Sequence, residues 1–280
     1  MAAIHPESSD THHDEPARTE GATRESVLDL PLATLHPADP LRWLARGWAD
    51  FRASARIGLF YGACFALMGQ ALWQVFQHAP AYVLALSAGF LLIGPFVALG
   101  LYDVSRALEQ GQRPSLRASL MAWRPTLSTM AIFGGVLLIF EMLWGRAAMV
   151  VFAVTMNTMP SSENMLAALL SLDNLEFLIA YVVVGAIFAG LIFVSSAISI
   201  PMILDRQTDA VSAALTSLRA CLQNPGVMLL WGALITLLCV LAMLPAFLGL
   251  LVVGPVLGHA TWHAYRHIVP ARGGAGSVTR

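Results

Sequence analysis

The sequence predicts an all-α membrane protein with six transmembrane helices, arranged as three repeats of a cytoplasmic amphipathic helix followed by a helical hairpin. Hydrophobic residues make up 57% of the 280 residues and charged residues only 12%, whereas a soluble domain carries about 25% charged residues. The mean hydropathy is +0.68. Two stretches, 57–102 and 220–265, contain no charged residue at all. A soluble core would not cover so much apolar surface.

The predicted spans follow from the spacing of charges and turn residues. A helix needs about 20 mainly apolar residues to cross the hydrocarbon core, so each charge-free stretch fits two spans and a short turn. Pro80 and Pro245 mark these two turns. A third pair of apolar segments lies between the two stretches. The predicted spans are 58–77, 81–102, 126–150, 177–200, 226–244 and 246–265.

Each pair of spans is preceded by a short segment with helical periodicity. The first places its apolar residues on one stripe that its arginines avoid, and Asp39 and Pro40 form its cap and first turn. The second opens at Ser115 and the third near Thr208. Such helices lie in the headgroup plane, although connectors packed on the bundle are the alternative for the second and third. The predicted stripes are Leu41, Leu44, Trp48, Phe51 and Ala55; Leu116, Leu120 and Trp123; and Val211, Leu215, Leu218 and Leu222.

The arginines predict the orientation, because short loops rich in basic residues stay in the cytoplasm. All basic residues are Arg, and every one except Arg146 falls on the same side of the predicted spans. Both termini are therefore expected in the cytoplasm. Residues 1–38 are predicted to be a disordered acidic tail, residues 39–268 the membrane domain, and residues 269–280 a flexible tail.

The first and last repeats share a Gly-Pro pair. Gly94-Pro95 and Gly254-Pro255 stand at equivalent places in their spans, which indicates internal duplication in parallel orientation. Proline removes a backbone donor, so the carbonyls of residues 91 and 251, both leucines, lose their usual partners. The pairs have two interpretations. They allow close packing around a kink, or Leu91, Gly94, Pro95, Leu251, Gly254 and Pro255 line a path for a neutral or weakly charged solute.

Three histidines on one face of the last predicted span are the strongest candidate metal ligands. His259, His263 and His267 repeat every four residues, so neighbouring pairs are close enough to share an ion, whereas all three are not. Asp103 and Asp205 are the candidate additional ligands. The alternative is that these are interfacial histidines bonded to neighbouring loops. No cofactor is predicted, and a metal ion or a haem is the alternative.

The predicted spans carry no charged residue at mid-depth. A proton relay through the membrane would therefore lack the carboxylate that such relays commonly use. The sequence shows no Ser/His/Asp order, no glycine-rich phosphate loop and no HExxH motif. We therefore expect no enzyme activity.

Several motifs in order resemble a bacterial membrane family catalogued as domain of unknown function 2189. The likeness covers residues 41–270 and implies a bacterial inner-membrane protein, without supplying an activity or a site residue. The motifs are Gly47-Trp48-Ala49-Asp50-Phe51, Leu59-Phe60-Tyr61-Gly62, Ile93-Gly94-Pro95-Phe96, the run Gly100 to Arg106, the run Ser199 to Arg206, Asn224-Pro225, and the run Leu257 to Arg266.

These observations lead to three expectations about function. The first is a non-catalytic membrane or signalling component, the second a permease or channel-like protein for a neutral or weakly charged solute, and the third a metal- or haem-binding protein using the C-terminal histidines. The lipid bilayer is the expected partner and nucleic acid is not. A homo-oligomer and a membrane partner protein stay open.

Overall fold

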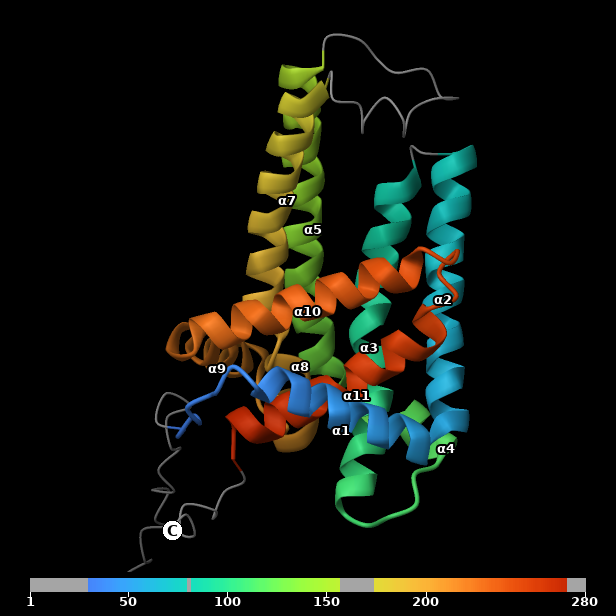
Figure 1. Cartoon of the computed structure of the whole chain (residues 1–280), viewed down its shortest axis with the longest axis vertical. Coiled ribbons are helices and arrows are strands. Elements are labelled where there is room, and N and C mark those ends of the chain that lie inside the picture. The colour runs from blue at the N-terminus through green and yellow to red at the C-terminus, as the bar shows by residue number, and fades with distance from the viewer. Residues whose placement is uncertain (1–29, 80–81, 157–173, 271–280) are drawn as a thin grey trace, which may run out of the picture.

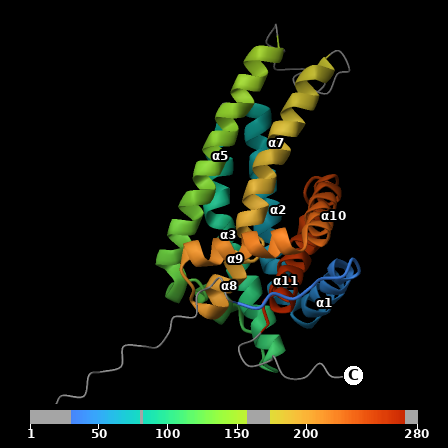
Figure 2. The ribbon, with the colours of Figure 1, turned by 90° about the vertical axis from the view of Figure 1, so that its left-hand side faces the viewer.

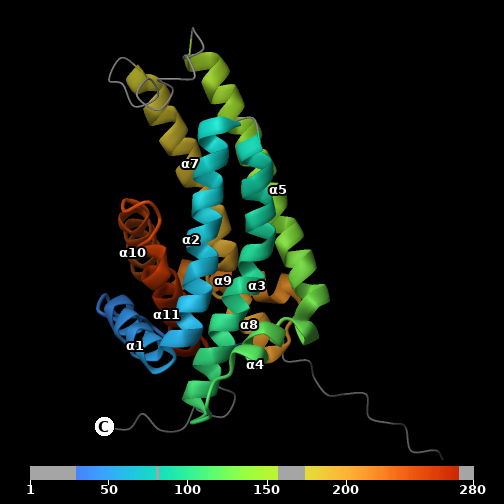
Figure 3. The ribbon, with the colours of Figure 1, turned by 90° about the vertical axis from the view of Figure 1, so that its right-hand side faces the viewer.

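The computed structural model describes residues 30–79, 82–156 and 174–270, and the regular elements in these ranges are helices (Figure 1). Four long helices run along the long axis of the molecule, and three others lie across them on one side (Figures 1 and 3). The long helices are α2 (Ala55–His78), α3 (Val83–Glu109), α5 (Leu127–Thr155) and α7 (Leu175–Ser196), and the crossing helices are α1 (Asp39–Ala53), α10 (Pro225–Met243) and α11 (Leu250–Ile268).

Four shorter elements complete the fold near the ends of the long helices at which α2 and α5 begin. We call this end the basal end. Figure 2 shows α9 lying across the feet of α5 and α7, both of which it contacts. The shorter elements are α4 (Leu116–Met121), the 3-10 helix η3 (Arg124–Thr126), α8 (Ser199–Arg206) and α9 (Ala210–Gln223).

Side-chain caps fix where the short helices begin. The Ser115 hydroxyl accepts a hydrogen bond from the Ala118 N–H (3.2 Å), which confirms the predicted start of the second amphipathic segment. The third segment begins one residue later than predicted, because the Asp209 carboxylate accepts from the Ser212 N–H (2.9 Å). Such caps satisfy amide groups that the first helical turn leaves without partners.

Four helical stretches in the described ranges are long and apolar enough to cross a membrane: Ala55–His78, Leu116–Thr155, Leu175–Arg206 and Pro225–Met243. They contain the predicted first, third and fourth spans and all but the last residue of the fifth. The predicted second and sixth spans correspond to α3 and α11, which are not among them. The count of six spans and the arrangement as three repeats therefore stay predictions.

The last hairpin lies across the bundle. The turn between α10 and α11 contacts α2 at Gly69 and Gln70, because the Gln70 side chain donates to the Ala246 carbonyl and the Phe247 ring fills the space above Gly69. Gln70 is eight residues before the end of α2 at His78, which is about 12 Å along a helix. The last hairpin thus stops short of the far end that the first hairpin reaches.

The stripe of α9 points outward. Val211, Leu215, Leu218 and Leu222 are 39–69% exposed, whereas the opposite face is small or polar and packs on the bundle, with Ala213, Thr216, Ser217 and Ala220 fully buried. This is the reverse of a helix on a soluble protein, which buries its apolar side. It is the arrangement expected of a helix whose apolar stripe meets lipid.

The stripe predicted for α1 needs a correction. Leu41 and Trp48 are exposed as a lipid-facing stripe requires, but Phe51 is buried and packs against Gly58. The face that α1 buries runs instead through Trp43, Gly47 and Phe51. The reason is that α1 is a docked helix with α11 as its main partner, and this partner selects a face that apolar periodicity alone does not identify.

Helix α11 lies at the centre of the packing, in contact with α1, α2, α3 and α10. Glycines let its backbone come close to its neighbours. A Cβ added at Gly47 of α1 would lie 2.6 Å from the Val256 carbonyl oxygen and 2.7 Å from the Ala260 nitrogen. A Cβ at Gly62 of α2 would overlap the Leu251 carbonyl. Two of the crossing points of α11 therefore require glycine.

Residues 30–38 correct the predicted boundary of the N-terminal tail. The Ala33 N–H donates to the Ile268 carbonyl at the end of α11 (3.0 Å), and the Asn224 side chain accepts from the Leu35 N–H (2.9 Å). Leu35 is buried, and two further leucines pack on the same core. The part assigned to a disordered tail therefore includes a segment fixed to the membrane domain, and residues 1–29 lie outside the described ranges.

Candidate functional site

A cluster of four polar side chains, two of them fully buried and two partly exposed, joins α1, α3 and α11 at the basal end. We call Asp50, Ser105, His259 and His263 the histidine cluster. The Ser105 hydroxyl donates to the Asp50 Oδ2 atom (2.7 Å) and lies 2.8 Å from the His259 Nδ1 atom. The His263 Nε2 atom lies 2.8 Å from the same oxygen of Asp50. One carboxylate oxygen of α1 thus accepts hydrogen bonds from α3 and from α11.

The bonding pattern assigns the protons within the cluster. A serine hydroxyl has one hydrogen, and in Ser105 this hydrogen goes to Asp50. The short contact to His259 is therefore a hydrogen bond in which the histidine Nδ1–H donates to the serine oxygen. The Nε2 atom of His259 is buried and has no hydrogen-bond partner in the described ranges.

Electrostatics favour an ionised Asp50. Burial alone would raise the pKa of this carboxyl group, but the hydrogen bonds from His263 and Ser105 outweigh it and lower the pKa below 3.8. Asp50 lies in α1, outside the predicted spans. The cluster therefore holds a negative charge beside two histidines at neutral pH.

The cluster contains the three residue types of a hydrolytic triad, but not a triad's arrangement. A nucleophilic serine gives its proton to a histidine, whereas Ser105 gives its proton to Asp50. Ser105 and His259 are both 0% exposed, so a substrate has no access to the hydroxyl. The bonds instead tie the N-terminal helix α1 to the middle and the end of the chain.

A second polar group lies beside the histidine cluster and connects α3, α8 and α11. Asp205 accepts a hydrogen bond from the Tyr265 hydroxyl (2.6 Å), and Arg266 lies 3.5 Å from Asp205 and donates to Glu109 (3.1 Å). Glu109 also accepts from the indole N–H of Trp262 (3.2 Å). Because each acid has a cation or a donor within reach, these groups stabilise one another.

The third histidine of the predicted row has its own partners. The Trp43 indole N–H donates to His267 Nδ1 (3.2 Å), which lies 4.0 Å from Asp39. Burial opposes ionisation of Asp39, but the His36 N–H, His267 and Arg42 lower the pKa of its carboxyl group. Asp39 thus accepts from the chain just before α1 and interacts with the last turn of α11.

The structure does not bring the five predicted metal ligands together. His259, His263 and His267 are bonded to Ser105, Asp50 and Trp43 respectively, as described above. Asp103 pairs with Arg106, and Asp205 pairs with Tyr265 and Arg266. In the part of the chain that the structure describes, no group of three or more His, Cys, Asp or Glu side chains is placed to hold a metal ion.

The two Gly-Pro pairs have different surroundings. The Leu251 carbonyl lies against Gly62 of α2, and Gly254 is close to the Phe65 ring, at 2.8 Å from an added Cβ. Around Gly94, no atom of the described part of the chain lies within 4 Å of an added Cβ. The side chains of Leu91 and Pro95 lie outside the described part of the chain. Close packing therefore accounts for the pair in α11, while a shared solute path stays a prediction.

Gly254 also borders a cavity of about 410 Å³ between α2, α3, α10 and α11. Its lining is almost entirely apolar, and its side-chain hydroxyls belong to Tyr102 and Thr261. The Thr261 hydroxyl already donates to the Leu257 carbonyl. The cavity thus offers a polar solute few bonding groups.

Sequence reasoning missed Asp50 and Ser105, the two residues that connect the histidines to other helices. Asp50 was visible as an acid on the arginine-rich first segment, and the spacing of Trp43, Gly47 and Asp50 would have placed it on one face. Ser105 stands in the motif run Gly100 to Arg106, but no local pattern indicates its partners. Its role depends on α3 lying beside both α1 and α11.

Residues 83–205 match the family described as "Predicted integral membrane protein (DUF2189)". This match confirms the resemblance that the sequence motifs indicate, and it agrees with the apolar helices of the structure. No curated protein and no solved structure matches the chain. The comparisons thus identify an integral membrane protein, and that description names no activity.

Proposed function

We propose that this protein is a non-catalytic membrane component of the bacterial inner membrane, with its basal end toward the cytoplasm. The observation that carries the proposal is the enclosure of the histidine cluster. Its central groups, Ser105 and His259, are fully buried, and the ionised Asp50 is already bonded to partners on two other helices. The burial of the serine and of His259, together with hydrogen bonds that join three helices, supports a role in folding and not in turnover.

The distribution of cations supports the orientation. The arginines of α1, α4 and η3 lie at the basal end, and Arg146 lies 19 residues into α5, toward the far end. Short basic segments are retained on the cytoplasmic side during insertion. The outward apolar stripe of α9 at the same end fits a helix embedded in that leaflet.

The proposal is tested with purified full-length protein in liposomes. We expect the permeability to glycerol and urea, followed by stopped-flow light scattering, to equal that of protein-free liposomes, and the bound metal to stay well below one ion per chain. Flux above the protein-free control would contradict a non-transporting role. Stoichiometric metal that is lost in the His263→Ala variant would favour the metal-binding alternative.

A permease for a neutral or weakly charged solute is the second candidate, and the cavity beside Gly254 supports it only for an uncharged solute, because its lining is almost entirely apolar. Its matched test is Pro255→Ala. Alanine supplies the N–H that proline lacks, so it can restore a helical bond to the Leu251 carbonyl and should preserve or raise thermal stability. If the parent shows flux that this variant abolishes, the kink belongs to a transport path. A variant that loses stability but keeps the flux assigns the kink to packing.

A further inference from the structure

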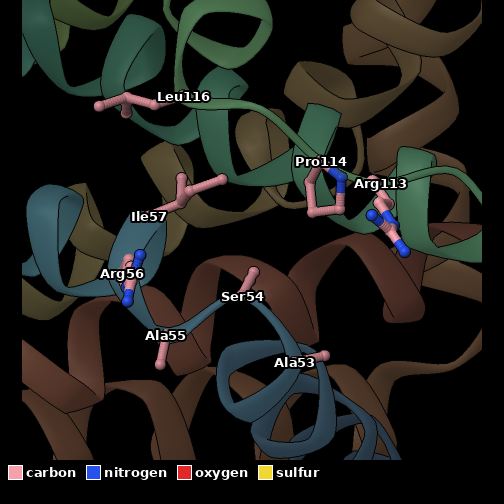
Figure 4. A pocket seen from close by; sticks show the side chains of 8 residues that line it. All are labelled: Ala53, Ser54, Ala55, Arg56, Ile57, Arg113, Pro114 and Leu116. Atoms are coloured by element: carbon pink, nitrogen blue, oxygen red, sulfur yellow. The ribbon is translucent and has the colours of Figure 1, made fainter.

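A second site lies away from the histidine cluster, at the junction of α1 and α2. Figure 4 shows an open pocket of about 630 Å³ between this junction and the loop that leads from α3 into α4. We call it the arginine pocket. It is lined by Ala53, Ser54, Ala55, Arg56, Ile57, Arg113, Pro114 and Leu116.

The arginine pocket is cationic without a counter-charge. Arg56 and Arg113 come from different segments and line it together, and no acidic side chain is among its lining residues. Within the described ranges, neither arginine forms an ion pair or a side-chain hydrogen bond, whereas Arg42, Arg106 and Arg266 all have acidic partners. Figure 4 shows the two side chains on opposite sides of the hollow, so together they give it a positive charge that favours an anionic group such as a phosphate.

The surface of α2 above the pocket is apolar and exposed. Phe60 and Leu67 follow Arg56 at positions i+4 and i+11, which places all three on one helix face. Phe60 is 40% exposed and Leu67 is 69% exposed. Eleven residues of helix span about 16 Å, about half the thickness of the hydrocarbon core. Leu67 therefore lies about one leaflet's depth from Arg56, and the apolar strip from Phe60 to Leu67 covers about 10 Å of that depth.

We propose that the arginine pocket binds the headgroup of an anionic phospholipid, with an acyl chain along the Phe60 and Leu67 face of α2. The two arginines attract the negatively charged headgroup. The apolar strip that begins one turn beyond Arg56 contacts the acyl chain. Basic pockets at the cytoplasmic ends of membrane helices recognise anionic lipids in this way. The site does not rest on the proposed function, because a transporter or a non-catalytic component would carry it equally.

The test is native mass spectrometry of the full-length protein in detergent, titrated with phosphatidylglycerol, with phosphatidylcholine or with inorganic phosphate. We expect one tightly retained phosphatidylglycerol and weaker retention of phosphatidylcholine. Each of Arg56→Gln and Arg113→Gln should weaken phosphatidylglycerol binding about fivefold, and the double variant about 25-fold, because each basic residue near a lipid surface contributes about 1 kcal/mol.

The matched control is the Arg46→Gln/Arg124→Gln double variant. These arginines are exposed at the same end but do not line the pocket, so phosphatidylglycerol binding should stay within about twofold of the parent. An equal loss in this control would show that general surface charge holds the lipid and would overturn the site. Phosphatidylcholine retained as well as phosphatidylglycerol would overturn it too.

Inorganic phosphate distinguishes a lipid from a small anion. If it displaces phosphatidylglycerol at comparable concentration, the pocket is a small-anion site and the lipid assignment is wrong. The Phe60→Ser/Leu67→Ser variant keeps both arginines and should weaken phosphatidylglycerol binding without changing the response to phosphate. Circular dichroism and melting curves check that each variant is folded, and the single arginine variants decide the outcome if a double variant is not.

Discussion

The His263 Nε2 atom lies 2.8 Å from the Asp50 Oδ2 atom, although 213 residues separate the two in the sequence. Both side chains are about 15% exposed, so water screens their interaction less than it screens a surface pair. This contact fixes α1 on α11, and the Ser105 bond to the same oxygen fixes it on α3.

The stability of this contact should depend on pH. The pKa of Asp50 is lower in the folded protein than its unfolded value of 3.8, so the charge stabilises the fold above that value and ceases to do so as the pH falls through the folded pKa. We expect Asp50→Asn to cost about 1.5–3 kcal/mol near neutral pH. Melting curves of the detergent-solubilised protein should show the difference between variant and parent shrinking as the pH falls below 3.8. Parallel curves at every pH would contradict the linkage.

Gly47 should tolerate no side chain. An added Cβ would lie 2.6 Å from the Val256 carbonyl oxygen, so Gly47→Ala forces α1 and α11 apart, and overpacking of this kind costs about 1–3 kcal/mol. Gly135→Ala in α5 is the matched control, because none of the described residues places an atom within 4 Å of its added Cβ. Alanine there should be neutral or stabilising by up to about 1 kcal/mol. Melting temperatures compare the two variants, and equal effects would show that the crossing is not close.

The outward stripe of α9 should contact lipid. In a variant without the native cysteines at 64, 221 and 239, nitroxide labels at residues 215 and 222 should be more accessible to oxygen than to a polar nickel chelate. A label at Gln223, an exposed polar residue next along the helix, should show the opposite preference. Electron paramagnetic resonance in liposomes measures both, and a polar environment at 215 and 222 would assign the stripe to a protein contact.

Reporter fusions test the orientation. Fusions after Arg113, Gln207 and Arg272 should report the cytoplasm, and fusions near Ala79 and Ser162 the outside; Ser162 and Arg272 lie outside the described ranges. An outside signal at Gln207 would contradict the six-span topology. A further fusion at Ala246 is informative, because this turn contacts Gln70 well before the end of α2.

The sequence was sufficient for the local features of the fold. The two charge-free stretches located α2, α3, α10 and α11, and the cap at Ser115 located the start of α4 correctly. Periodicity identified the stripe of α9, which the structure shows to be exposed. These features depend on hydrogen bonds and apolar spacing within a few residues, so they can be read from a single segment.

The long-range features could not be predicted in the same way. The crossing direction of the α10–α11 hairpin depends on the close backbone contacts that α11 makes at Gly47 of α1 and Gly62 of α2. These glycines belong to other helices, so the sequence of the hairpin alone does not reveal them. Neighbouring histidines of the row were candidates for sharing a metal ion, with hydrogen bonds to neighbouring segments as the alternative, and the sequence could not identify the different hydrogen-bond partner that the structure gives each histidine. The periodicity of a helix predicts which residues share a face. The contacts of that face depend on neighbouring helices, which the sequence of the helix does not specify.

The dependence of α1 on α11 has a consequence for synthesis. At about 5–20 residues per second, roughly 10–40 s separate the translation of Asp50 from that of His263. During this interval α1 has emerged from the ribosome while the helix it docks on does not yet exist. During this interval α1 can bind the membrane surface through its exposed side chains Leu41 and Trp48, because the apolar side of an amphipathic helix adsorbs to the membrane interface. Completion of the C-terminal segment then converts an adsorbed peptide into a fixed part of the protein, so chains truncated before α11 should insert their first spans but leave the N-terminal helix open to proteases.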